Sequence, residues 1–381
     1  MKKRQWFWIM ILLMLTPCLT SCWDRFELTE LGFVQALAID KGEGNTIRLT
    51  TQLSKPTSES LTTTAYENIE TQAATIPEAV RDIPLKLGRK AKWDHMQVLL
   101  ISEELAKQRN LFNMLDFFRR GYEPRGTIQI VLTKGEAKNY LSKSTLIDQT
   151  TGQHLNNILE KSFRFNAKAI PTTLFDFDKD SLSEVGVAML PYIHINQTNT
   201  LTVAGMALLK NGHIEYLIPT DNVKKLLMLT NQYKSGSLEI PCVKSSQKKE
   251  SFEIQTASTN IRPTIRNNKL TIDVYTKIKG SPFNLNCYTL KTPEEEIKYA
   301  KVVERTIKEK LQDMLTTLQH KKLDAIGIGN KIYYQNPKQW QKWKKNWDNV
   351  FAQSKSKIHV KVQITNKGMS GPGDPQSNDR P

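Results

Sequence analysis

The chain opens with a short basic segment and a run of ten consecutive apolar residues, Trp6 to Leu15. A helix needs about 20 apolar residues to cross the hydrocarbon core of a bilayer, so this run is typical of a signal peptide. The sequence Leu-Thr-Ser-Cys follows and ends at Cys22, a pattern that a lipoprotein signal peptidase cleaves once the thiol is acylated. We therefore expect a signal peptide over residues 1–21 and a mature chain that begins at a lipid-modified Cys22.

The anchor decides where the rest of the chain folds. Two or three acyl chains, at about 0.8 kcal/mol per buried methylene, hold a protein on a bilayer for long times. The expected location is therefore the outer face of a membrane. The alternatives are an ordinary signal peptide with an incidental cysteine and an uncleaved anchor. Cys18 fits cleavage less well because Pro17 precedes it.

Length and composition describe an ordinary globular body. The 381 residues leave enough chain after the signal peptide for about two domains, each with its own core. The net charge of +16 is scattered through amphipathic segments, without a recognition helix or an aromatic-basic sheet signature, so nucleic acid is not an expected partner. A cationic body beside anionic lipid headgroups accounts for the charge.

The first half of the chain alternates strand and helix patterns. Residues 32–40 and 46–53 flank a glycine-containing turn and predict a β-hairpin, and the Ser/Thr-rich residues 55–64 predict a loop. The segments that follow are a helix over 76–87 interrupted at Pro84, a strand over 96–101, helices from 102 and 110, a strand over 127–133, a helix over 135–141 and a helical region over 152–180 broken at Pro171. This alternation predicts a mixed α/β fold with a partly parallel sheet and helices on its faces.

The second half begins after the polar residues 196–199, which are interpreted as a linker. Asn211-Gly212 predicts a hairpin between two strands, and Asp221 is expected to cap a helix. Strands are expected over 238–243, 252–261, 270–279 and 358–364, and a Trp-rich amphipathic stretch over 337–351. The sequence thus predicts several small domains: an N-terminal region over 22–195, a C-terminal domain over 196–367 and a disordered tail over 368–381.

The longest helical pattern starts at Thr292, where Pro and three glutamates follow a capping residue. Apolar residues then recur at intervals of three and four, which gives one apolar stripe. The stripe is made of Ile297, Ala300, Val303, Ile307, Leu311, Met314, Leu315 and Leu318. It is interpreted as a face that packs on the core, with a docking site for a partner helix as the alternative.

Two cysteines remain once Cys22 is lipidated. Cys242 and Cys287 lie in or near predicted strands of the second half. An exported protein permits a disulfide between them, and buried free thiols are the alternative.

A search for chemistry-bearing motifs finds no metal site or cofactor loop. The histidines form no ligand cluster, and His95, beside Asp94, is interpreted as structural. Ile-Gly-Ile-Gly over 326–329 lacks the third glycine of a dinucleotide loop and is interpreted as a tight turn. Two Ser-x-x-Lys matches, Ser245 to Lys248 and Ser354 to Lys357, lack the companion motifs of an acyltransferase. We therefore expect neither metal nor cofactor.

The start Cys22-Trp23-Asp24-Arg25 resembles the opening of the Ger(x)C family of spore-germination lipoproteins, where Cys-Trp-Asp follows the signal peptide. Residues 89–107 resemble the family's His-strand-Glu-Glu-Leu-Ala segment, and residues 119–125 its Arg-rich turn. Asp324-Ala325-Ile326-Gly327 is similar to the family's Asp-x-x-Gly after a long helix, and residues 337–368 to its closing segment. The matches run in order along most of the chain.

The resemblance implies a non-enzymatic C subunit of a nutrient-germinant receptor, with a mixed α/β fold of several small domains. In the family this lipoprotein works with two integral membrane subunits, A and B, at the inner membrane of the dormant spore. The complex senses a small-molecule germinant and triggers germination. The resemblance implies no catalytic residue, and the site carried over is lipid attachment, with fatty acyl groups such as palmitate, at Cys22.

Two rival functions follow from a lipid anchor. A solute-binding lipoprotein of a transporter needs two similar lobes around a cleft, and the sequence shows no lobe repeat. A cell-wall enzyme needs a catalytic motif, for which the sequence gives no clear candidate.

Overall fold

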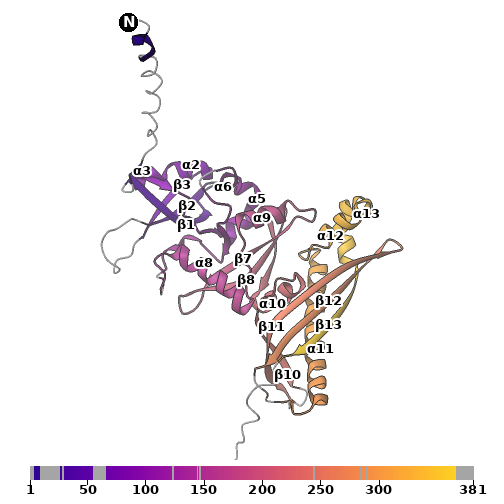
Figure 1. The fold of residues 1–381 in the computed structure, drawn as a ribbon. Coiled ribbons are helices and arrows are strands. Elements are labelled where there is room, and N and C mark those ends of the chain that lie inside the picture. Colours follow the sequence, from indigo (N-terminus) through magenta and orange to yellow (C-terminus); the bar gives the residue numbers. More distant parts are fainter. Residues whose placement is uncertain are drawn as a thin grey trace, which may run out of the picture.

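The computed structural model describes residues 4–8, 26–27, 30–54, 66–121, 124–143, 145, 147–242, 245–283, 285, 287–288 and 290–365. Two sheets organise the described residues, one of nine strands and one of four (Figure 1). The expectation of a mixed α/β fold with a long helix in the C-terminal half is confirmed.

The first sheet has the order β3-β2-β1-β5-β6-β7-β8-β9, and β4 pairs with β1. Its strands are Leu31–Lys41 (β1), Ile47–Ser54 (β2), Tyr66–Ala73 (β3), Lys90–Lys92 (β4), Val98–Ser102 (β5), Gln129–Thr133 (β6), Val187–Ile195 (β7), Leu201–Lys210 (β8) and His213–Pro219 (β9). The central strands β1, β5, β6 and β7 are parallel, and the outer ones pair antiparallel. Every residue of β5 and β6 is buried, as expected for parallel strands covered on both faces.

Helices cover both faces of this sheet. One face carries Ile76–Arg81 (α2), Ile83–Leu87 (α3), Glu103–Gln108 (α4), Leu111–Met114 (α5), Asp116–Arg120 (α6) and Leu174–Ser181 (α9). The other carries Lys138–Leu141 (α7), Thr151–Lys161 (α8) with the π-helix Ser162–Asn166 (η3), and Thr220–Leu229 (α10). Side chains alternate along β1. Leu37 and Ile39 pack in the core under α2–α6 and α9, whereas Ala36 and Ala38 pack in the core under α7, α8 and α10.

The second sheet has the order β10-β11-β12-β13. Its strands are Gly236–Cys242 (β10), Ser245–Arg266 (β11), Lys269–Pro282 (β12) and Lys355–Ile364 (β13). β13 is parallel to β12, and a parallel pair needs a crossover connection. The crossover consists of Pro293–Lys321 (α11), Ile328–Gln335 (α12), Pro337–Trp343 (α13), the 3₁₀ helix Lys344–Asn346 (η4) and Trp347–Ala352 (α14).

α11 is a helix of 29 residues that starts as the sequence predicts. The Thr292 hydroxyl accepts a hydrogen bond from the Glu295 backbone N–H (3.2 Å), and the Glu295 carboxylate accepts one from the Thr292 N–H (3.2 Å). Most of the predicted stripe is buried, from Val303 to Leu318. Ile297 departs from it and is 56 % exposed, whereas Tyr299, two residues further along α11, is fully buried.

α10 connects the two sheets through one continuous core. Its buried residues Val223, Leu226 and Leu227 belong to the same apolar cluster as Leu208 of β8 and Leu311 of α11. Because the apolar cluster is uninterrupted at this point, the two halves pack as one body (Figure 1).

Several local expectations are confirmed. β1 and β2 form the predicted antiparallel hairpin, and β8 and β9 pair around Asn211-Gly212. The predicted helix over 76–87 is interrupted, with α2 ending at Arg81 and Pro84 in the first turn of α3.

Two expectations are wrong. Residues 196–199 do not form an interdomain linker: they make the tight turn between β7 and β8, where Asn196 N–H donates to the Thr200 carbonyl (2.9 Å). Asp221 does not cap a helix, because α10 begins one residue earlier with Pro219 at the cap position. Asp221 lies in the first turn, where its charge suits the helix dipole. The loop predicted at 55–64 and the tail at 368–381 lie outside the described residues.

The capping box of α11 gives a first prediction. Thr292→Ala removes the hydroxyl that accepts from Glu295 N–H and should lower the free energy of unfolding by about 1 kcal/mol. Urea denaturation followed by circular dichroism measures this change. Thr292→Ser keeps a hydroxyl at the same position and should retain most of the stability. Equal losses in the two variants would contradict a role for the cap.

Candidate functional site

Cys22, the predicted lipid-attachment residue, lies outside the described residues. Among the residues that are described, no helix has the length and apolar content of a membrane span.

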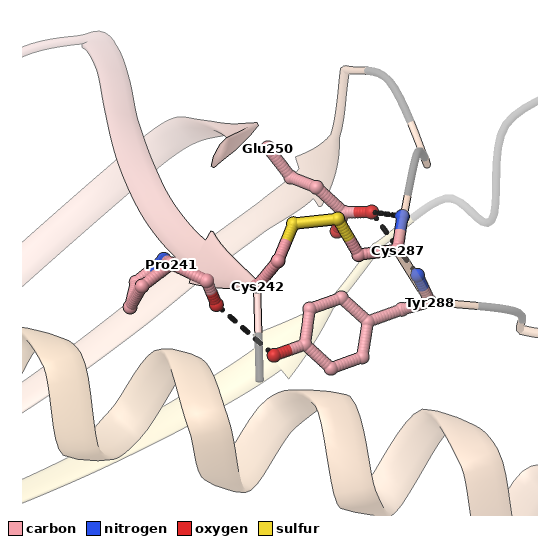
Figure 2. The surroundings of a disulfide bond; sticks show 5 residues. All are labelled: Pro241, Cys242, Glu250, Cys287 and Tyr288. Atoms are coloured by element: carbon pink, nitrogen blue, oxygen red, sulfur yellow. Dashed lines mark hydrogen bonds between the residues drawn. A yellow bond between two sulfur atoms is a disulfide. The ribbon is translucent and has the colours of Figure 1, made fainter. Parts of the chain in front are cut away.

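Cys242 and Cys287 form a disulfide with Cα atoms 5.7 Å apart (Figure 2). It joins the end of β10 to the segment that leads into α11. The Glu250 carboxylate of β11 accepts hydrogen bonds from the backbone N–H groups of Cys287 and Tyr288, the latter at 3.1 Å. The Tyr288 hydroxyl donates to the Pro241 carbonyl (3.1 Å). Of the two states that the sequence leaves open, the structure therefore has the bridge.

Aromatic side chains close the corner beside the disulfide. Tyr299 of α11 lies 5.1 Å from the ring of Tyr288 and 6.2 Å from that of Phe252. Burial raises the pKa of Tyr299, so its hydroxyl stays protonated. This corner is a packed structural element that fixes the start of α11.

A second polar cluster, which we call the junction, joins the loop between α9 and β7 to α12 and α13. The Trp340 indole N–H donates to the Glu184 carboxylate (2.7 Å), which also pairs with Lys344 (2.8 Å). The Val185 backbone N–H donates to the Asn330 side-chain carbonyl (3.2 Å). The hydrogen bond from Lys344, followed by that from Trp340, lowers the pKa of Glu184, so the carboxylate is charged.

Asp324 is the buried carboxylate behind the junction, with only 3 % of its surface exposed. It accepts hydrogen bonds from the backbone N–H groups of Ile328 (2.9 Å) and Gly329 (2.7 Å) and from the Trp347 indole (3.2 Å). Burial raises its pKa to about 7, and the three hydrogen bonds oppose that rise. Asp324 thus fixes the start of α12 and the orientation of Trp347 with one side chain.

The two glycines of the Ile-Gly-Ile-Gly segment are required for different structural reasons. Gly327 precedes α12 with a left-handed φ of 70°. At Gly329 a Cβ atom would lie 2.5 Å from Val185 and 2.8 Å from Trp340, so the helix can approach its neighbours only without a side chain there. The interpretation of this segment as a tight turn holds for Ile326 and Gly327, whereas Ile328 and Gly329 already form the first turn of α12.

The other residues singled out in the sequence do not converge on a reactive site. The His95 ring packs edge-on against Phe33 at 5.0 Å, and its Nε2 lies 3.9 Å from the Asp94 carboxylate. The Ser354 hydroxyl donates to the Phe351 carbonyl (2.7 Å), which closes α14. Within the described ranges, no group of three or more His, Cys, Asp or Glu side chains could hold a metal ion.

Two hollows open on the described surface. A groove of about 820 Å³ lies between α2 and the α5–α6 pair, lined by residues that include Ile76, Arg109, Asn113 and Phe117. A polar hollow of about 390 Å³ lies at the junction beside Glu184 and Lys344.

Comparison with known protein families accounts for both halves of the chain. Residues 24–195 match the spore germination protein N-terminal domain, and residues 204–368 match the spore germination B3/GerAC-like C-terminal domain. The chain belongs to the GerAC/GerBC-like family of spore germination proteins. The two matched regions together include both sheets and the junction between them.

Individual members of the GerAC/GerBC-like family are similar over nearly their whole length. Spore germination protein B3 of Bacillus subtilis is 25% identical over 97% of this chain and 100% of that protein. Spore germination protein KC of the same organism is 23% identical over 90% of each chain. The crystal structure of the GerBC protein has the same fold, with a TM-score of 0.60 and 20% identity, over 87% of this chain and 97% of that one.

Sequence reasoning missed most of the junction. Only the Asp-x-x-Gly resemblance indicates Asp324, and nothing in the local sequence marks the half-buried Glu184 or the buried Glu250 as hydrogen-bond partners. Their partners lie far away along the chain, Trp340 for Glu184 and Cys287 for Glu250. An Asp four residues before the first residue of a helix is the one local signal that could have indicated a capping role for Asp324.

Asp324 gives a pH-dependent prediction. Its pKa is about 7 in the folded chain against an ordinary value of 3.8, so the folded chain binds this proton more tightly than the unfolded one. The free energy of unfolding should therefore fall as pH rises from about 4 to about 7, by up to about 4 kcal/mol from this group. Urea denaturation across that range, compared with Asp324→Asn, isolates the effect, because the native chain should lose stability relative to the variant.

Asp348→Asn is the matched control for Asp324. It removes an exposed carboxylate, paired with Lys210, from the same part of the fold. Because this variant retains Asp324, its free energy of unfolding should fall between pH 4 and pH 7 as that of the native chain does. A difference between native chain and Asp324→Asn that stays constant from pH 4 to pH 7 would contradict the raised pKa.

The disulfide gives a third prediction. Its two cysteines are 45 residues apart, so the bridge removes a large amount of loop entropy from the unfolded chain. Cys242→Ser with Cys287→Ser should lower the free energy of unfolding by about 2–4 kcal/mol. The native chain treated with a reductant should show the same loss in a urea titration, and the double variant should not respond to reductant. A reductant effect of equal size in the double variant would contradict this assignment.

Proposed function

We propose that this chain is a lipid-anchored, non-enzymatic subunit of a spore nutrient-germinant receptor that acts with two integral membrane subunits to trigger germination. The observation that carries this proposal is the match of both family domains, residues 24–195 and 204–368, in order along one chain. The relatives named as spore germination proteins support it over 90% or more of this chain.

The physical role follows from the anchor. Acyl chains on Cys22 restrict the body to the membrane plane and raise its effective concentration beside membrane partners. Contacts with the A and B subunits then need only modest intrinsic affinity. The continuous core through α10 supports this role, because a partner contact on either half moves the whole body.

A transporter's solute-binding lipoprotein is the weaker candidate. That function needs two similar lobes around a cleft, whereas the two halves contain a nine-stranded and a four-stranded sheet of different topology. The groove beside α2 lies within one half and not between two lobes.

The anchor gives a fourth prediction. Cys22→Ala removes the acylated thiol, so the chain should disappear from the spore membrane fraction and nutrient-triggered germination should be lost. Fractionation with immunoblotting, and the fall in optical density of spores given nutrient, measure the two effects.

Cys18→Ala is the matched control, since it changes a neighbouring cysteine of the signal segment. It should leave both membrane retention and germination unchanged. Full retention and normal germination in Cys22→Ala spores would overturn the proposed anchor, and mass spectrometry of the N-terminal peptide shows directly whether residue 22 is acylated.

A further inference from the structure

The described body begins beside a basic turn. Phe26 is the first described residue after the signal segment, and Leu31 at the start of β1 pairs with Lys90 of β4. The Lys90 ammonium lies 4.2 Å from the centre of the Phe26 ring. The entry of the chain and the turn between α3 and β4 therefore form one surface.

This surface is both cationic and apolar. Residues 84–92 contain four cations and no carboxylate: Lys86, Arg89, Lys90 and Lys92. Within the described part of the chain, none of these four forms an ion pair with a carboxylate. Leu85, on the exposed side of α3, has 82 % of its surface exposed, and Phe26 has 45 %. Cations interleaved with exposed Leu and Phe are typical of protein surfaces that lie in the lipid headgroup layer.

The position of this surface is limited by the tether. Three residues lie between Cys22 and Phe26, and the four steps from Cα to Cα span at most about 14 Å in an extended chain. The headgroup layer is itself about 5–8 Å thick on each side of a bilayer. An acyl chain on Cys22 therefore holds Phe26 and Lys90 within reach of the headgroups.

We propose that Phe26, Leu85, Lys86, Arg89 and Lys90 form a headgroup-binding face that docks the body on anionic lipid. The proposal rests on the lipid anchor of the proposed function. The acyl chains supply attachment, and the face supplies orientation: it turns the α3 end toward the bilayer and the α12 end away from it (Figure 1). The same lead contains three carboxylates, Asp24, Glu27 and Glu30, and the four cations of residues 84–92 outnumber them.

Each cation near an anionic surface changes membrane partitioning by about fivefold. Arg89→Glu with Lys90→Glu should therefore release the face from anionic lipid, while the acyl chains keep the protein on the vesicle. Lys90 is exposed and Arg89 half-buried, and neither forms an ion pair among the described residues, so the fold should be retained. Circular dichroism checks the fold.

The experiment places a fluorescent label on the full, lipidated chain in vesicles. Leu85→Cys supplies the labelling site, and Tyr334→Cys, on α12 and 80 % exposed, is the distant control. Vesicles of phosphatidylcholine alone are compared with vesicles that contain phosphatidylglycerol, and quenching by spin-labelled lipid reports contact. We expect several-fold stronger quenching at position 85 than at 334 in anionic vesicles, and none of this difference in neutral ones.

Charge variants complete the test. Arg89→Glu with Lys90→Glu should abolish the quenching at position 85, whereas Lys298→Glu with Lys301→Glu, an equal charge change on exposed residues of α11, should leave it intact. Quenching at 85 no stronger than at 334, or unaffected by lipid charge, or seen only when receptor subunits are added, would overturn the headgroup-binding face.

The lipid anchor and the headgroup-binding face are tested by separate measurements. A chain that fails to float with neutral vesicles overturns the anchor, because flotation there needs the acyl chains. Quenching at position 85 in anionic vesicles decides the face in either case.

Discussion

The packing of the two halves depends on the hydrogen bonds that the buried carboxylate of Asp324 accepts. It accepts from the first N–H groups of α12 and from the Trp347 indole, so one side chain fixes both the start of a helix and the neighbouring aromatic layer. Trp347 packs on Trp340 with ring centres 5.1 Å apart, and Trp340 reaches Glu184 of the other half. A charge removed from water is stable only when hydrogen bonds surround it, which makes this arrangement sensitive to the loss of any donor.

A single packed body would suit the lipid tether proposed at one end of the chain. The apolar cluster runs without interruption from β8 through α10 to α11, so the core has no break at which the halves could separate. The disulfide and the Glu250 carboxylate fix the opposite corner, where the chain enters α11. An orientation imposed near residue 26, as proposed, would therefore extend to the far helices.

Local patterns were enough to predict the elements, and long-range contacts were not predictable. The capping box at Thr292 and the Asn211-Gly212 turn are encoded by neighbouring residues, so both were found. The linker predicted at residues 196–199 is wrong because a hairpin turn and a linker need the same polar residues. The junction depends on Glu184 and Trp340, which are 156 residues apart, and no local pattern marks such a pair. The family resemblance supports the proposed function, which composition and spacing alone do not indicate.

The turn at 196–199 also determines where the chain can be divided. Both family domains meet within the β7–β8 hairpin, at residues 195 and 204. A fragment that stopped at residue 195 would leave β7 as an unpaired edge, and an open edge strand recruits other chains and aggregates. The boundary between the two family domains is therefore not a place where the chain can be divided into pieces that fold. The smallest piece that can fold contains both domains.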